Sequence, residues 1–215
     1  MIRFVSFDLY NCLVDLRLDE KIWDLAIPSF YARERNVPFD KAYERVSREY
    51  ALHGKDDPAF RDVEYWFRHL KLKSDWRSVF DEVNDNAITF VFDDVRRTLP
   101  SLQKRYSLVV FTAEKKEYAV KKLEITKLRP YFTEVFSTHE FGDRAKSAQG
   151  FMWLSKKLKC DPSEVVHVGD DRRFDYALPR EVGMRSFLVD RTGFEQGPDV
   201  VRSIVDVETE LMPPE

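Results

Sequence analysis

The chain has few cysteines, no long apolar run and little net charge. Its 215 residues include 2 cysteines, Cys12 and Cys160, which are too few for a disulfide framework and match no spacing typical of a zinc site. We therefore expect both thiols to be reduced, as in a cytoplasmic protein. The 35 Lys and Arg residues nearly balance the 38 Asp and Glu residues, and the net charge of −3 favours neither nucleic acid nor an anionic membrane as a partner.

No signal peptide or membrane-spanning segment is predicted. The short apolar stretch at residues 2–7 ends at Asp8, and Asp15 follows before a span of about 20 apolar residues could form. Hydrophobic residues make up 43% of the chain, which suffices for a substantial core and excludes disorder as the main state. We expect a cytoplasmic protein with one domain, or with a core domain that carries a smaller insertion.

Short apolar runs rich in strand-forming residues recur along the chain. They predict strands at residues 2–7, 108–111, 135–137, 165–168 and 186–189. Between the later runs, helical spacing predicts helices at residues 115–123, 147–159 and 176–182. Because strands and helices alternate, we predict a doubly wound parallel α/β sheet of the Rossmann-like kind. Ligands bind beyond the carboxyl ends of the strands in such sheets, so we expect the chemistry just after each apolar run.

Residues 16–96 differ from the rest because they contain no convincing strand. They predict three or four amphipathic helices, at residues 19–35, 39–52, 58–70 and 75–92. This block separates the first strand from the others. We therefore predict an α/β core of residues 1–15 and 97–215, with residues 16–96 inserted as an α-helical cap domain. Residues 208–215 end in Met-Pro-Pro-Glu and are expected to be loose.

Polar residues stand at the ends of three predicted strands and before one predicted helix. They are Asp8, Thr112, Lys146 and the acidic residues Asp170, Asp171 and Asp175. Taken singly, each residue is typical of a helix cap, a turn or a surface charge. Their shared place at the carboxyl ends of the strands predicts a site.

Several of these residues are carboxylates, which resist joint ionisation in one crevice unless a cation lies among them. Lys146 supplies a single positive charge. Mg²⁺, a hard cation that binds carboxylates, carbonyl groups and water, would balance the remaining charge and leave a position for a phosphate oxygen. Direct salt bridges from Arg172 and Arg173 are the alternative.

In order and context these residues resemble the motifs of the haloacid dehalogenase superfamily. That superfamily has an aspartate nucleophile, a Ser or Thr, a Lys and an acidic metal-binding loop, in this order, at the ends of parallel strands. The resemblance covers residues 2–15 and 102–190, including the stretch Tyr131-Phe132-Thr133-Glu134-Val135-Phe136-Ser137. The helical block after the first motif is similar to the superfamily's helical cap of the first type.

The resemblance implies a Mg²⁺-dependent phosphatase that hydrolyses a small phosphorylated metabolite through an aspartyl phosphate on Asp8. By analogy, the metal ligands are Asp8, the backbone carbonyl of Tyr10 and Asp170. Asp171 or Asp175 would support the metal directly or through water. Thr112, Lys146 and the backbone amides after Asp8 would donate hydrogen bonds to the phosphoryl oxygens. The implied partner is a small-molecule phosphate ester, without nucleic acid or membrane.

Tyr10 departs from the superfamily's usual pattern. Most of its phosphatases have a second aspartate at this catalytic position, which protonates the leaving group and then activates water. A phenol with a reference pKa of about 10 is a poor base near neutral pH. A tyrosine here is typical of the dehalogenases, whose halide leaves without a proton. A hydrolytic 2-haloacid dehalogenase and a catalytically weakened relative that binds a phosphorylated ligand are therefore alternatives.

The acidic loop favours the phosphatase, because the dehalogenases need no metal and lack such a loop. Asn11-Cys12 replaces the usual Gly-Thr, and we expect Cys12 to be a small packed side chain rather than a catalytic thiol. A replacement acid or base, or a substrate contact, could come from the helical block. The candidates are Arg33, Arg35, Tyr65, Trp66, Arg68 and His69. Alternatively, Trp66 and Leu70 form the core of that block, and His167 is a hydrogen-bonded strand residue.

Overall fold

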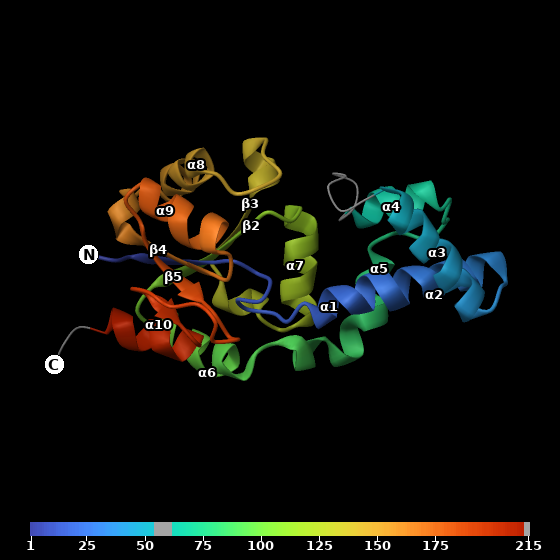
Figure 1. Ribbon diagram of the computed structural model, residues 1–215, viewed down its shortest axis with the longest axis horizontal. Helices are drawn as coiled ribbons and strands as arrows, with labels where there is room; N and C mark the ends of the chain where they lie inside the picture. The colour runs from blue at the N-terminus through green and yellow to red at the C-terminus, as the bar shows by residue number, and fades with distance from the viewer. Residues whose placement is uncertain (54–61, 213–215) are drawn as a thin grey trace. The chain divides into compact units, whose positions relative to one another are not determined.

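Six parallel strands form one sheet in the computed structural model of the chain, which describes residues 1–53 and 62–212 (Figure 1). The strand order is β3-β2-β1-β4-β5-β6, and every pairing is parallel. In chain order the strands are β1 (Phe4–Phe7), β2 (Ser107–Thr112), β3 (Glu134–Ser137), β4 (Val165–Gly169), β5 (Arg185–Val189) and β6 (Val200–Val201). The predicted doubly wound parallel α/β fold is confirmed, and β6 is an additional strand at the sheet edge.

The apolar character of the strands follows from burial on both faces of the sheet. All five residues of β4 are buried, as are the last three of β1. β1 lies between β2 and β4, and Phe7 at its end pairs with Val110 on one side and Val168 on the other. The chain moves from β1 toward β3 first and later from β4 toward β6. The strand order therefore reverses between β1 and β4, where sheets of this kind bind ligands.

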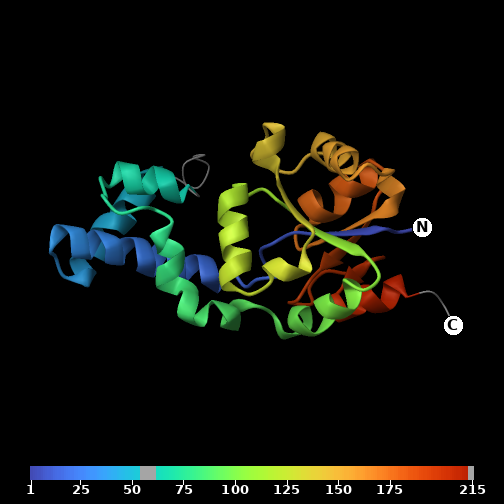
Figure 2. The same ribbon diagram turned by 180° about the vertical axis from the view of Figure 1, so that it is seen from behind.

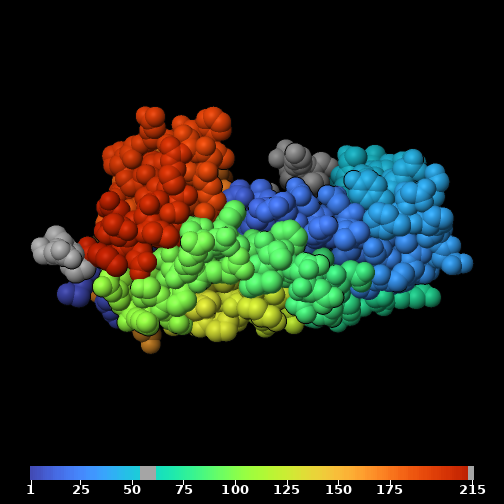
Figure 3. All heavy atoms as spheres, turned by 90° about the horizontal axis from the view of Figure 1, so that it is seen from below, coloured from blue at the N-terminus to red at the C-terminus, as the bar shows by residue number. Residues whose placement is uncertain are grey.

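The chain divides into two compact units, Met1–Asp15 with Val91–Glu215 and Leu16–Phe90, which we call the α/β unit and the helical unit. In the α/β unit, α8 and α9 cover one face of the sheet, and α6 and α10 cover the other (Figures 1 and 2). Figure 3 views the second face, where the spheres of α10 adjoin those of α6. The helices of this unit are α6 (Asp93–Leu102), α7 (Lys116–Ile125), α8 (Ala148–Leu158), α9 (Leu178–Glu181) and α10 (Ile204–Leu211). A π-helical segment, Arg172–Ala177, leads into α9.

The helical unit contains no strand among its described residues. Its helices are α1 (Arg17–Glu20), the π-helical segment Lys21–Ala26, α2 (Ile27–Arg35), α3 (Phe39–His53), α4 (Val63–His69), α5 (Ser78–Val83) and the 3₁₀ helix Asn84–Phe90. Trp66, Val46 and Phe80 are fully buried, and Leu70 is buried as well. Trp66 and Leu70 therefore belong to the core of this unit. No described helix of the chain has the length and apolar composition needed to cross a bilayer.

Three predicted segments need correction. The helix expected at 75–92 is an α-helix only over Ser78–Val83, because Asn84, Asp85 and Asn86 compete with the helical backbone for hydrogen bonds. The tail expected to be loose from residue 208 instead continues α10 to Leu211, and Ser203 caps that helix. The helix expected at 58–70 is observed from Val63, and residues 58–61 lie outside the described part of the chain.

Candidate active site

Asp8 is the first residue after the central strand β1. Its backbone N–H donates to the carbonyl of Val168 at 2.8 Å, which extends the pairing with β4 to the start of the loop. The side chain is buried, and burial raises the pKa of Asp8 from 3.8 to about 7, against the attraction of Lys146. Asp175 and Asp170 raise this pKa further. Asp8 is thus a buried carboxyl group close to other acids.

Asp8, Asp170 and Asp175 form an acidic group. Each offers one carboxylate oxygen, and these three oxygens all lie within 4.8 Å of one another. Lys146 Nζ contacts Asp8 Oδ1 and Asp175 Oδ1. Burial alone would lower the pKa of Lys146, but Asp175 and Asp8 outweigh burial and raise it. Lys146 is therefore a firmly charged ammonium that faces three carboxyl groups.

Asp175 is held by groups on both sides. Its Oδ1 accepts a hydrogen bond from His167 Nε2 at 3.1 Å, and its Oδ2 accepts one from the Asp171 backbone N–H at 3.1 Å. Because a carboxylate accepts only, His167 carries its proton on Nε2, and its Nδ1 accepts from Ser6 Oγ at 3.0 Å. Burial lowers the pKa of His167, so the ring is neutral. A Cβ atom at Gly169 would overlap the Asp175 side chain, which explains the glycine at this position.

The side chain of the neighbouring residue Asp171 binds backbone groups and does not contribute to the acidic group. Its Oδ1 accepts the backbone N–H groups of Arg173 and Phe174, at 2.8 and 2.7 Å, and so caps the segment that follows. Of the two residues considered as support for a metal, Asp175 contributes to the acidic group and Asp171 caps a helix. Arg172 pairs with Glu195 at 2.6 Å rather than with the acidic group.

The loop after Asp8 tolerates its unusual sequence for local reasons. Asn11 has a φ of 49°, a left-handed conformation that asparagine adopts more readily than most residues. Its side chain hydrogen-bonds to Asp170, although burial keeps the pKa of Asp170 raised. Cys12 is fully buried, and burial raises the pKa of its thiol, so it is a packed thiol as expected. The carbonyl of Tyr10 accepts the N–H of Cys12 at 2.5 Å.

Thr112 ends β2, next to the central strand, and is buried. Its Oγ1 accepts the backbone N–H of Glu114 at 3.2 Å. The side chain of Glu114 turns toward Tyr10, whose hydroxyl donates to Glu114 Oε1 at 3.0 Å, and Lys122 Nζ contacts the same oxygen. No sequence motif predicts a role for Glu114 or Lys122. Only the position of Glu114, two residues after Thr112, could have drawn attention to it.

Four of the candidates in the helical unit, Arg33, Arg35, Tyr65 and His69, bind partners within that unit. Arg33 pairs with Glu82 at 2.9 Å, and Arg35 donates to the Leu70 carbonyl at 2.9 Å. Trp66 is buried and Arg68 is exposed. The remaining contacts join Tyr65 Oη to His53 Nε2 at 2.6 Å and His69 Nε2 to Glu49 Oε2 at 2.8 Å.

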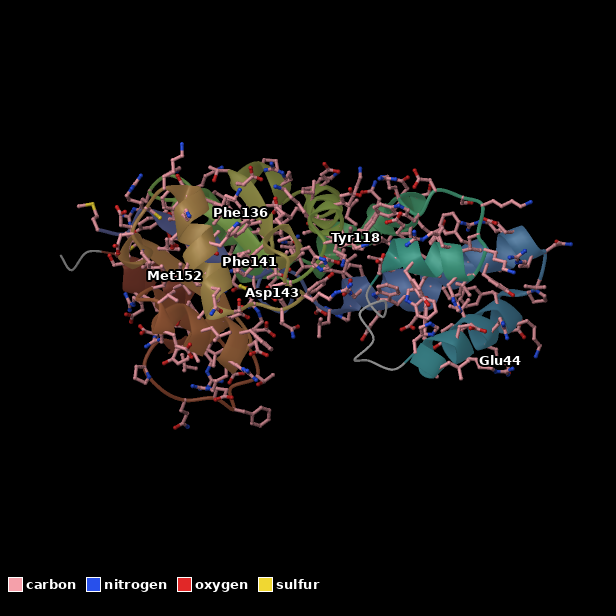
Figure 4. The ribbon with its side chains drawn as sticks, turned by 90° about the horizontal axis from the view of Figure 1, so that it is seen from above. Glu44, Tyr118, Phe136, Phe141, Asp143 and Met152 are labelled. Atoms are coloured by element: carbon pink, nitrogen blue, oxygen red, sulfur yellow. The ribbon has the colours of Figure 1, made fainter. Side chains whose placement is uncertain are left out.

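An open hollow of about 650 Å³ lies over α8, away from these residues. Its lining includes Phe141, Met152 and Trp153, and Figure 4 labels the first two. None of its lining residues belongs to the acidic group. This hollow is therefore separate from the acidic group at the ends of β1 and β4.

The model of the haloacid dehalogenase-like hydrolase family matches residues 35–189, which is more than half of the chain. The chain belongs to this family. The expected resemblance is confirmed, and with it the general class of hydrolase. The match begins after Asp8 and includes Thr112, Lys146 and the acidic residues Asp170, Asp171 and Asp175.

Three relatives illustrate the range of the family. A phosphoglycolate phosphatase of Vibrio vulnificus (strain CMCP6) is 23% identical over 222 residues, covering 95% of this chain and 90% of the relative. The crystal structure of a phosphatase of this family from Thermococcus onnurineus has a TM-score of 0.74 at 22% identity, with 98% of each chain covered. A 2-haloacid dehalogenase structure from Pseudomonas syringae pv. Tomato DC3000 has a TM-score of 0.64 at 23% identity, also with 98% of each chain covered. At such identities the solved structures show the shared fold.

Proposed function

We propose that the chain is a Mg²⁺-dependent phosphatase that hydrolyses a small phosphorylated metabolite through an aspartyl phosphate on Asp8. The observation that carries this proposal is the acidic group of Asp8, Asp170 and Asp175, with three carboxylate oxygens within 4.8 Å of one another. The similarity to a phosphoglycolate phosphatase of Vibrio vulnificus supports a phosphate ester as the class of substrate.

The residues present fit a magnesium ion. Mg²⁺ prefers oxygen ligands and is commonly held by one or two carboxylates together with water and substrate phosphate. Asp8 and Asp170 supply such carboxylates, and the Tyr10 carbonyl belongs to the loop that directly follows Asp8. The pKa values of Asp8 and Asp170 are both raised, first by burial, so a cation here would relieve an unfavourable concentration of negative charge.

In the mechanism, an oxygen of the Asp8 carboxylate attacks phosphorus, and the bond from phosphorus to the leaving oxygen breaks. Lys146, fixed between Asp8 and Asp175, donates hydrogen bonds and charge to the phosphoryl oxygens. Thr112, at the end of the neighbouring strand, provides a hydroxyl donor. Bound Mg²⁺ supplies Lewis-acid stabilisation of phosphoryl charge. Water then attacks phosphorus, the bond to Asp8 breaks, and free Asp8 is restored.

A hydrolytic dehalogenase is the second candidate, because Tyr10 and the structural likeness to a 2-haloacid dehalogenase favour it. Both reactions would use Asp8 as nucleophile. The acidic group argues for the phosphatase. Three carboxyl groups facing the single ammonium of Lys146 are suited to a metal ion and poorly suited to attracting a haloacid anion.

We further propose that the helical unit acts as the cap that selects the substrate. It is inserted in the loop that follows Asp8. Its first residue, Leu16, lies eight positions after Asp8 in the sequence, and its last residue, Phe90, directly precedes Val91 of the α/β unit. Asp171 and the cap would then support the site rather than carry out the chemistry. The expected partner remains a small-molecule phosphate ester.

The test is a broad screen of phosphate esters and short 2-haloacids, with and without added Mg²⁺. We expect phosphate release that requires Mg²⁺ and no halide release. Calorimetry should detect Mg²⁺ binding that Asp170→Asn weakens by roughly 10-fold or more. Asp81→Asn, an exposed aspartate of the helical unit, is the control and should bind Mg²⁺ as the wild type does.

Two outcomes would contradict the proposal. Halide release without added metal would favour the dehalogenase. Binding of a phosphorylated ligand without turnover of any ester in the screen would favour a catalytically weakened relative.

A further inference from the structure

Tyr10 and Glu114 form a side-chain pair between the loops that follow β1 and β2. Tyr10 stands two residues after Asp8, and its hydroxyl donates to Glu114 Oε1 at 3.0 Å. Both residues belong to the α/β unit, Tyr10 from the loop after β1 and Glu114 from the loop after β2. Tyr10 occupies the position at which most phosphatases of the superfamily have a second aspartate. In this chain the Glu114 carboxylate accepts a hydrogen bond from the Tyr10 side chain.

Lys122 completes this arrangement. Its Nζ contacts the same oxygen, Glu114 Oε1, and lies 4.5 Å from the centre of the Tyr10 ring. The Lys122 side chain is 4% exposed and that of Glu114 is 13% exposed, so the ion pair is largely shielded from water. Lys122 lies on α7, one helical turn after Tyr118. Figure 4 labels Tyr118. Shielding from water strengthens the interaction between the charges and fixes the direction of the Tyr10 hydroxyl.

The backbone of Glu114 is fixed as well. Its N–H donates to Thr112 Oγ1 at 3.2 Å, and its carbonyl accepts from Ser137 Oγ at 2.5 Å. Thr112 and Ser137 are paired residues at the ends of β2 and β3. The backbone of Glu114 is thus fixed at the carboxyl ends of β2 and β3, and Asp8 follows the carboxyl end of the adjacent strand β1. Such fixed support suits a side chain that positions another group.

We propose that Tyr10 transfers protons to the leaving group and from the attacking water, and that Glu114, paired with Lys122, is the positioning residue that relays these protons. This inference rests on the proposed phosphatase function. Tyr10 is the catalytic residue because its hydroxyl would touch the substrate. Glu114 acts through Tyr10 and supplies the carboxylate function from a neighbouring strand.

The protons balance over one cycle. When the bond from phosphorus to the leaving oxygen breaks, that oxygen takes the proton of Tyr10 Oη, and Tyr10 takes a proton from the Glu114 and Lys122 pair. When water attacks the aspartyl phosphate, its proton passes to Tyr10, and Tyr10 returns a proton to the pair. Water is the only co-reactant, and the enzyme ends in its starting state.

A purely structural role for the ion pair is the competing explanation. Buried ion pairs often add little stability compared with apolar residues of similar size, so stability alone is a weak reason for this pair. The two explanations differ in kinetics. A structural role affects all substrates alike, whereas a proton relay matters most when the leaving group needs a proton.

The experiment compares wild type, Glu114→Gln, Tyr10→Phe and the double variant with Mg²⁺ present. The substrates are p-nitrophenyl phosphate, whose leaving group departs easily, and phenyl phosphate, whose leaving group is more basic. The ratio kcat/KM reports the steps through phosphorylation of Asp8, and the early time course of p-nitrophenol release reports the later step. Circular dichroism checks the fold of each variant.

We expect Glu114→Gln to lower kcat/KM roughly 10²-fold on phenyl phosphate and less than about threefold on p-nitrophenyl phosphate. On p-nitrophenyl phosphate its kcat should also fall, with an initial burst of p-nitrophenol, because hydrolysis of the aspartyl phosphate has slowed. Tyr10→Phe should show the same selectivity, and the double variant should be no worse than either single variant. If Glu114→Gln does not fold, Tyr10→Phe decides the question alone.

Equal losses on both substrates, or losses that multiply in the double variant, would overturn the relay while leaving the phosphatase function intact. Absence of wild-type turnover on every ester of the broad screen, these two included, would instead overturn the phosphatase function and the relay together. Glu124→Gln is the matched control, because Glu124 is an exposed carboxylate on α7 that pairs with Lys121. Its kinetics should match those of the wild type.

Discussion

Arg191 Nη1 contacts both carboxylate oxygens of Asp94, at 2.9 and 3.0 Å. The other nitrogens of the guanidinium donate to the carbonyls of Asn11 and Cys12, at 3.0 and 2.7 Å. The guanidinium also lies 3.8 Å from the centre of the Phe92 ring. One side chain therefore links the loop after Asp8 to the start of α6, near the two points where the α/β unit continues into the helical unit.

Replacing Arg191 by lysine should destabilise the α/β unit. Lysine has no planar fork and cannot contact Asp94 and the two carbonyls at once. We expect a loss of about 2 kcal/mol in the free energy of unfolding, measured by urea denaturation. Arg97→Lys, at an arginine of α6 whose side chain is 78% exposed, should change the stability by less than about 0.5 kcal/mol. Equal losses in the two variants would contradict the role given to Arg191.

Asp8→Asn should abolish turnover and preserve the fold. The amide is nearly the same size as the carboxyl group but cannot attack phosphorus, so we expect at least roughly a 10³-fold loss in kcat. Phosphate release and circular dichroism together test this. Asp40→Asn, at an exposed aspartate of α3, should keep wild-type activity. An active Asp8→Asn variant would show that another group is the nucleophile.

Gly169→Ala should displace Asp175 from the acidic group. The added Cβ would overlap the Asp175 side chain, so the aspartate must move or the end of β4 must shift. We expect a loss of about 1–3 kcal/mol in stability and weaker stabilisation by Mg²⁺ in thermal melts. In Gly150→Ala the new Cβ would meet Phe111 only at 3.4 Å, and its response to Mg²⁺ should match that of the wild type. A normal Mg²⁺ response in Gly169→Ala would contradict the prediction.

Glu34→Gln should make the helical unit less stable near neutral pH. Glu34 accepts hydrogen bonds from Lys73 N, Ser74 N and Ser74 Oγ, at 2.7, 3.0 and 2.8 Å. Partial burial would raise the pKa of Glu34, but these hydrogen bonds outweigh it and lower the pKa. A lowered pKa in the folded state means that the stabilisation is present above the unfolded pKa of about 4.3 and is lost as the pH falls through the folded pKa.

We therefore expect the wild type to exceed Glu34→Gln by about 1 kcal/mol at about pH 7 and the difference to vanish toward about pH 3. Thermal melts over this pH range measure it. Glu44→Gln, at an exposed glutamate of α3 (Figure 4), should show no such difference. A gap between wild type and Glu34→Gln that grows as the pH falls would contradict the assignment.

The sheet could be predicted from the sequence because its strands are buried on both faces. Strands such as Val165–Gly169 then become nearly continuous apolar runs, which the sequence displays directly. The strand Val200–Val201 was not predicted, because two residues are too few to show the alternation or the apolar run that indicates a strand. The helix Asp93–Leu102 escaped because Pro100 lies inside it, and proline usually argues against a helix interior.

The acidic group was also within reach of sequence reasoning. Phe7 and Val168 pair at the ends of β1 and β4, so the residues that follow each strand meet by the geometry of parallel strands. The contacts of Glu114 and Lys122 were not. These contacts depend on the path of the short loop that carries Glu114 and on how α7 is rotated about its own axis. The spacing of apolar residues in the sequence predicts neither.

The central place of β1 in the sheet sets the order in which the molecule can be assembled during synthesis. Phe4 pairs with Ser107 and with Val165, so the first strand leaves the ribosome long before either neighbour exists. The helical unit, which ends at Phe90, is complete before β2 has been made. Closing the sheet therefore requires contacts between distant parts of the chain, which slow folding. A nascent chain acquires its acidic group only after Asp175 has emerged, so Asp8 stays without Asp170 and Asp175 until most of the protein has been translated.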